Sequence, residues 1–102
     1  MISNQVINNC IREAGEISKV VFSVFDSIGN PVAKTEGADT IDKKVILNFI
    51  QSTAETQEVN GSLLFKVYEE RQTGYVLAAS GDGDAFLVGK LVVSQLQNLI
   101  IA

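Results

Sequence analysis

The spacing of apolar residues divides the chain into alternating helical and extended segments. Six of them near the start recur at helical spacing: Ile2, Val6, Ile7, Cys10, Ile11 and Ala14. Ser3 or Asn4 can cap this predicted helix, and Gly15 lies just past its end. The segment Lys19–Asp26 is β-branched and aromatic, with apolar residues on both alternating faces. That pattern predicts a central strand covered on both sides.

A tight turn and a short returning strand are expected next. In the segment Asp26–Asn30, Gly29 can adopt positive φ and Asp26 can accept hydrogen bonds from its own turn backbone. The segment Pro31–Thr35 then returns as a partner strand. Because Pro31 has no N–H to donate, this strand is predicted at the edge of the sheet.

A second helix follows a polar connector from Glu36 to Thr40. Its apolar face consists of Ile41, Val45, Ile46, Phe49 and Ile50. Asp39 or Thr40 is the expected cap. The polar segment Ser52–Asn60 is predicted to be a solvated loop.

The remaining pattern predicts a hairpin and a third helix. The pattern predicts two strands, Ser62–Glu69 and Tyr75–Ser80, joined by a turn at residues 71–74. The Gly-rich segment that follows stops the second strand, and Asp84 is placed to cap a final helix.

The element order is therefore helix, hairpin, helix, hairpin, helix. It predicts an α+β fold, a single domain over residues 1–102, with an antiparallel sheet of about four or five strands and flanking helices. Profilin-like, PAS-like and roadblock-like domains share this plan.

The final helix is apolar around nearly its whole circumference, more than packing on one sheet requires. One stripe consists of Val88, Val92, Leu96 and Leu99. A second consists of Phe86, Val93, Ile100 and Gly89, where glycine permits close backbone approach. We expect a homodimer whose interface is the first stripe, the alternative being a helix buried in the core of one chain. The helix reaches Ala102 without a stop signal, which suggests the amino-terminal part of a longer protein.

Composition excludes several classes of function. The 102 residues contain no His and one Cys, and the net charge is −4. A disulfide framework and most catalytic constellations are thus absent, and attraction to nucleic acid or anionic lipid is unfavourable. We expect no enzyme activity, no metal and no cofactor. With neither an export signal nor an apolar run long enough to span a bilayer, a cytoplasmic protein is expected. Cys10 is expected to be a small buried hydrophobe.

Three cationic side chains are the candidates for binding a small acidic molecule: Lys34, Lys66 and Arg71. A pocket is expected between the sheet and the second helix, with the connector Glu36–Thr40 at its mouth. The pair Asp82 and Asp84 supplies too few oxygens for a calcium site and reads instead as a turn with its helix cap.

Four segments carry a resemblance to a known family: Phe65–Glu70, Tyr75–Asp82, Val88–Lys90 and Gln95–Ile100. Together with the start Met1–Gln5 they resemble the amino-terminal region of bacterial sugar diacid utilization regulators, which are transcription factors. The resemblance implies a sensory domain for a sugar diacid or related small acid. It also implies a carboxy-terminal helix-turn-helix region, absent from this chain, through which the complete protein contacts DNA.

Two functions from different classes follow. The first is a non-enzymatic sensor and dimerisation domain that transmits ligand occupancy to a distant DNA-binding region. The second is a roadblock-like interaction scaffold that partners small GTPases or motility complexes, in which two sheets join edge to edge across a dimer.

Overall fold

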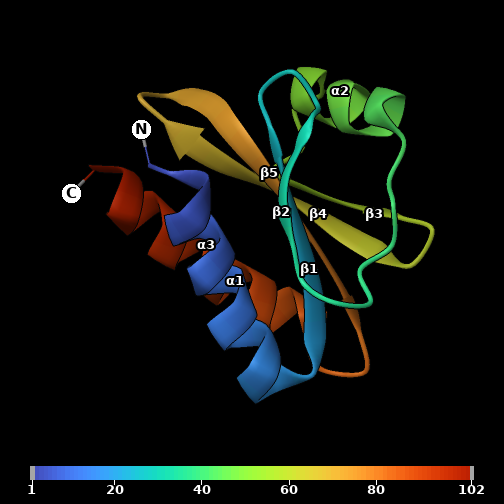
Figure 1. Cartoon of the computed structure of the whole chain (residues 1–102). Coiled ribbons are helices and arrows are strands. Elements are labelled where there is room, and N and C mark those ends of the chain that lie inside the picture. Colours follow the sequence, from blue (N-terminus) through green and yellow to red (C-terminus); the bar gives the residue numbers. More distant parts are fainter. Residues whose placement is uncertain (1, 102) are drawn as a thin grey trace.

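The computed structural model describes residues 2–101, which form three helices and five strands (Figure 1). In chain order these are α1 (Asn4–Ser18), β1 (Val20–Asp26), β2 (Pro31–Lys34), α2 (Lys43–Gln51), β3 (Thr56–Val59), β4 (Ser62–Glu69), β5 (Gln72–Gly81) and α3 (Ala85–Ile101). The predicted α+β class is confirmed.

The five strands form one sheet in the order β2-β1-β5-β4-β3, and every neighbouring pair is antiparallel. β1 lies inside the sheet, where Phe22 pairs with Ala79 of β5. The strand that begins at Pro31 lies at one edge, as predicted. This pairing of β1 with β5 joins the two hairpins into a single sheet.

The helices lie on both faces of the sheet. α1 and α3 are side by side on one face, and α2 lies on the other (Figure 1). Alternating residues of β1 divide accordingly: Phe22 and Val24 belong to the core under α1 and α3, whereas Phe25 belongs to the core under α2. The predicted covering of both faces of this strand is confirmed.

α1 begins as predicted but ends later. The Ser3 hydroxyl accepts a hydrogen bond from the Val6 N–H at 3.2 Å, so Ser3 is the N-cap. The helix continues through Gly15 to Ser18 and is closed by Lys19 in the left-handed conformation at φ 62°. The prediction that it stops at Gly15 was wrong. A Cβ on Gly15 would lie 3.1 Å from the Val20 carbonyl oxygen, so this glycine serves close approach between α1 and β1.

The caps of the other two helices give one correction and one confirmation. Asp42 caps α2, since its carboxylate accepts the Lys44 N–H at 2.8 Å. The predicted caps Asp39 and Thr40 lie before it in an irregular segment. Asp84 accepts the Leu87 N–H at 3.0 Å and caps α3 as predicted.

The predicted loop Ser52–Asn60 is the largest error in the fold. It contains β3, which pairs with β4 from Thr56 opposite Phe65 to Val59 opposite Ser62. Asn60 and Gly61, at φ 50° and 85°, form the two-residue turn between them. An Asn-Gly pair with both φ values positive is the preferred connection of a tight hairpin, whereas polar composition alone suggested a loop.

The two predicted turns also differ in outcome. At the first, the Asp26 carboxylate accepts the N–H groups of Ile28 and Asn30, and Gly29 has φ 87°, as predicted. The second turn consists of Glu70 and Arg71 rather than residues 71–74. Gly74 lies inside β5 as the extra residue of a β-bulge opposite Val67 and Tyr68, which explains its presence there.

Candidate functional site

The outer edge of β3 is an open sheet edge. The direction of its backbone groups follows from the hairpin: Val59 and Ser62 flank the two-residue turn as a hydrogen-bonded pair. The Lys66 N–H also donates to the Glu55 carbonyl at 3.1 Å. Hydrogen bonds to β4 therefore form at every second residue, counted back from Val59 to Glu55. The N–H and C=O groups of Thr56 and Glu58 therefore point away from β4, along the free edge.

The opposite edge is less suited to pairing with another strand. β2 begins at Pro31, which has no N–H, and Val32 is an extra residue that bulges opposite Val24 and Phe25. α1 also packs against β2. Both proline and bulges discourage sheet extension, so β3 is the edge that a further strand can join.

The predicted dimer stripe lies mainly inside the chain itself. Val92 and Leu96 are 2% and 1% exposed and pack in the core under α1 and α3. Val88 and Leu99 are half-buried against the same core. These residues face the sheet and α1, so the assignment of a dimer interface to Val92 and Leu96 is corrected: they are not at the surface.

Gly89 permits close approach, as predicted, but to the chain's own sheet. It is buried against the ring of Phe65 in β4. α3 is therefore covered by the sheet on one side and by α1 on another, which accounts for much of its apolar circumference.

Part of α3 remains uncovered. Phe86, Leu87 and Leu91 are 52%, 56% and 62% exposed. Beside Leu91, a groove of about 370 Å³ runs between α3 and α1, where Ala14 and Ile17 form part of the opposite wall. These exposed side chains and Ile101, and not the stripe predicted as the interface, form the apolar surface that α3 presents.

Lys66 has a structural role. It is 7% exposed, its ammonium group donates to the Ser52 carbonyl, and it lies 5.2 Å from the centroid of the Phe49 ring. The amine thereby ties β4 to the end of α2. It is already engaged within the chain, which removes it from the predicted ligand rim.

The three predicted cations do not converge. Arg71 is exposed in the turn between β4 and β5, with φ 70°. Lys34 is exposed on β2, at the edge of the sheet. Two strands, β1 and β5, lie between Lys34 on β2 and Lys66 on β4. A single small ligand therefore does not contact all three side chains in this arrangement.

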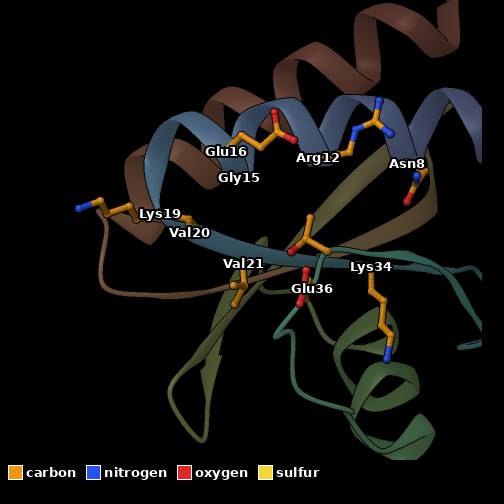
Figure 2. A pocket seen from close by; sticks show the side chains of 10 residues that line it. Asn8, Arg12, Gly15, Glu16, Lys19, Val20, Val21, Lys34 and Glu36 are labelled. Carbon is orange, nitrogen blue, oxygen red and sulfur yellow. The ribbon is translucent and has the colours of Figure 1, made fainter.

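A groove of about 420 Å³ lies between α1 and the adjoining ends of β1 and β2 (Figure 2). Figure 2 shows the ends of Arg12, Lys19 and Lys34 pointing away from one another. The Arg12 guanidinium donates instead to the Asn9 side chain at 3.2 Å. The charged groups around this groove thus do not aim at a common point.

A smaller cavity of about 260 Å³ lies beside the connector to α2, as predicted, but Lys43, the first residue of α2, is the one residue of that helix that lines it. Its lining comprises Ser23, Phe25, Gly29, Asn30, Pro31, Lys34, Asp39, Thr40, Ile41 and Lys43. Lys34 is the one predicted cation that lines it. Ser23 was missed by sequence reasoning, although it is the only polar residue in the run Val20–Phe25.

Burial changes the pKa of two titratable side chains, Cys10 and Tyr75. Cys10 is buried as predicted, and burial, with the negative charge of Glu13, raises the pKa of its thiol. Burial, with Glu69 and Asp26, likewise raises the pKa of Tyr75. No cluster of three or more potential metal ligands occurs among residues 2–101.

Comparison with known proteins identifies the fold. No protein-family model matches the chain, and no curated protein matches it by sequence. Among solved structures, Myxococcus xanthus MglB is similar, with a TM-score of 0.64 and 15% sequence identity over 97% of this chain and 92% of that one. The chain therefore shares the roadblock fold of MglB. In the part of the chain that the structure describes, no helix is long and apolar enough to cross a membrane.

Proposed function

We propose that the chain is a non-enzymatic interaction module of the roadblock type. It associates with a second copy through the outer edge of β3, and the dimer serves as a scaffold for partner proteins such as small GTPases or motility complexes. The observation that carries this proposal is the open β3 edge on a fold shared with MglB.

The sequence of β3 suits pairing with itself. An antiparallel register centred on Gln57 places Thr56 opposite Glu58 of the second copy, and Glu58 opposite Thr56. These are the residues whose backbone groups face outward, so each pair exchanges two backbone hydrogen bonds. No like charges lie directly opposite in this register, which favours it over one that aligns Glu58 with Glu58.

Self-association in this register makes one continuous sheet across the dimer. The added bonds are main-chain bonds, as in other cases of strand addition. The helices α1 and α3 of both copies then lie on one face and the two α2 helices on the other, giving a composite surface on each side.

A proline on the outward-facing side of β3 tests the proposal. Glu58→Pro removes an N–H that points away from β4, so it leaves the β3–β4 pairing in place. Glu58→Gln removes the charge but keeps the N–H and is the matched control. Light scattering after gel filtration should give twice 11.0 kDa for the unaltered chain and for Glu58→Gln, and 11.0 kDa for Glu58→Pro.

Two results would reject this interface. One is an unaltered chain that is monomeric at every concentration, and the other is a Glu58→Pro variant that remains dimeric. Circular dichroism of both variants confirms that they are folded.

A second candidate function is the small-acid sensor implied by the resemblance to sugar diacid regulators. The 260 Å³ cavity favours it, because the cavity lies beside the connector as expected and Lys34 lines it. A thermal-shift screen with small carboxylic acids, including glucarate and benzoate, tests it. A rise in melting temperature with at least one of these acids, reduced by Lys34→Gln, is the expected result, and no rise with any of them would count against this function.

A further inference from the structure

We propose that the 260 Å³ cavity between β1, β2 and the segment before α2 binds a small monocarboxylate with an apolar body. The carboxylate is held by the Ser23 hydroxyl and the Lys34 ammonium, and the body lies against Phe25, Pro31 and Ile41. This deepens the small-acid sensor function by naming its ligand class, and it is independent of association through β3.

Ser23 is the residue that points to a ligand. It alternates with Phe22 and Val24, which face α1 and α3, so its side chain faces the α2 side of the sheet. The residue is 5% exposed, yet no hydrogen bond to its hydroxyl occurs within residues 2–101. Every fully enclosed side-chain oxygen or nitrogen in that range has a hydrogen-bond partner. Because the Ser23 Oγ has none, it is not fully enclosed, and a ligand in the cavity that Ser23 lines can contact it.

Lys34 supplies the charge. It is directly opposite Ser23 in the β1–β2 pairing, so the two Cβ atoms are about 5 Å apart on the same face. Figure 2 shows the Lys34 side chain leaving the groove beside α1 and extending toward α2, which is the side of this cavity. A hydroxyl donor and an ammonium donor on directly opposite positions of one face can each bind one oxygen of the same carboxylate.

The other walls define the rest of the ligand. Part of the lining is apolar and consists of Phe25, Pro31 and Ile41. An apolar lining suits a ligand with an aliphatic or aromatic body better than one with a chain of hydroxyl groups. Lys43 is partly engaged, because its ammonium group donates to the Asn30 side chain at 3.2 Å. With Lys34 and Lys43 against Asp39, the lining carries a net positive charge, which favours an anion. The volume is that of about nine water molecules, so the ligand is small.

Benzoate, benzamide and glucarate are the probes that test this assignment. Benzamide has the shape of benzoate without its charge, and glucarate has carboxylates without an apolar body. Amide chemical shifts in two-dimensional NMR should change saturably at Ser23, Lys34 and Ile41 with benzoate. Benzamide should bind about tenfold more weakly, and glucarate should produce no saturable change.

Three variants locate the binding. Lys34→Gln should weaken benzoate binding about tenfold, and Ser23→Leu should abolish it by filling the cavity. Lys44→Gln is the matched control, because Lys44 is an exposed lysine of α2 that does not line the cavity. It should bind benzoate as the unaltered chain does. Lys34 is exposed, so its variant remains informative if Ser23→Leu fails to fold.

Four results would overturn the assignment. The first is that benzoate causes no saturable chemical-shift change, and the second is that benzamide binds as tightly as benzoate. The third is that Lys44→Gln weakens benzoate binding as much as Lys34→Gln does, and the fourth is that glucarate binds but benzoate does not. The last would leave the small-acid sensor standing with a different ligand class. None of them bears on the mass of the dimer, so failure here is distinct from failure at the β3 edge.

Discussion

Gly89 of α3 lies against the aromatic ring of Phe65 in β4, so closely that a Cβ on Gly89 would come within 2.6 Å of the ring Cζ. The glycine thus sets the distance between helix and sheet. It also explains why the neighbouring side chains Val92 and Leu96 reach the core of their own chain.

Gly89→Ala should destabilise the protein by up to about 2 kcal/mol. Alanine gains about 1 kcal/mol of helix propensity, but its methyl group overlaps the Phe65 ring, and overpacking of this kind costs about 1–3 kcal/mol. Urea unfolding measures the difference. Ser94→Ala, at an exposed position of the same helix, is the control and should be neutral or slightly stabilising. A more stable Gly89→Ala variant would contradict the close contact.

Lys66→Met should lower the free energy of unfolding by about 1–3 kcal/mol, because it leaves the Ser52 carbonyl without its donor and removes a buried cation from the Phe49 ring. Lys90 provides a matched comparison: its ammonium group lies 5.6 Å from the centroid of the Phe86 ring, but the residue is exposed. Lys90→Met should change stability by less than about 0.5 kcal/mol. Equal effects in thermal unfolding would show that burial of Lys66 is unimportant.

Leu96→Asp and Leu91→Asp should separate the core face of α3 from its exposed face. Leu96 is 1% exposed, so a carboxylate there should cost on the order of 4 kcal/mol and leave the chain largely unfolded. Leu91 is 62% exposed, so Leu91→Asp should remain folded by circular dichroism. Leu91→Asp should also remain a dimer in light scattering, because the proposed interface is β3. A folded but monomeric Leu91→Asp would instead place the dimer interface on the exposed apolar face of α3.

Asp84→Ala should destabilise the protein by about 1 kcal/mol, since the N-cap of α3 loses the hydrogen bond from the Leu87 N–H. Asp82→Ala removes an exposed carboxylate two residues earlier and should have an effect below about 0.5 kcal/mol. Denaturant titration of both variants distinguishes a cap from a general effect of negative charge. If both variants lose a similar free energy of unfolding, the negative charge before the helix, and not the cap hydrogen bond, is what stabilises it.

Stability should decline at alkaline pH through Cys10. Its thiol pKa is raised above the ordinary value of 9.0 by burial and by Glu13. Above pH 9 the unfolded chain releases the thiol proton while the folded chain retains it, so the stabilising contribution is lost as pH rises through the folded pKa. Tyr75 acts in the same direction above its ordinary pKa of 10.0. Thermal unfolding of Cys10→Ala between about pH 9 and 10 should therefore show a shallower decline, and an unchanged decline would contradict this role.

Short sequence patterns correctly predicted the features that depend only on neighbouring residues, such as helix caps and the edge position of a strand that begins with proline. Ser3 and Asp84 act as caps because each side chain reaches a backbone N–H within its own first turn. Pro31 lies at an edge because the residue has no N–H wherever the chain folds. β3 was missed because three of its four residues are polar and its two middle residues are exposed, so the segment acquires a strand's hydrogen bonds only by pairing with β4.

The candidate site was predicted only in part. A cavity beside the connector was expected from the predicted hairpin and helix, and Lys34 lines it. That Lys34 binds a ligand there stays a prediction. Ser23 was not singled out, since an isolated serine in an apolar strand has no distinctive pattern. Lys66 could not be distinguished from a rim cation, because its contact with the Ser52 carbonyl joins positions 14 residues apart.

By itself, the sequence determined the α+β class, most of the helices and strands, and the absence of histidine chemistry, because periodicity, caps and composition act within a few residues. Only the tertiary structure decided which apolar face of α3 is buried, which sheet edge is open, and that Ser23 and Lys34 lie side by side. The first two depend on the pairing of β1 with β5 and on the layering of α1 beside α3, and the third depends on the register between β1 and β2; all of these bring together residues that no local pattern connects.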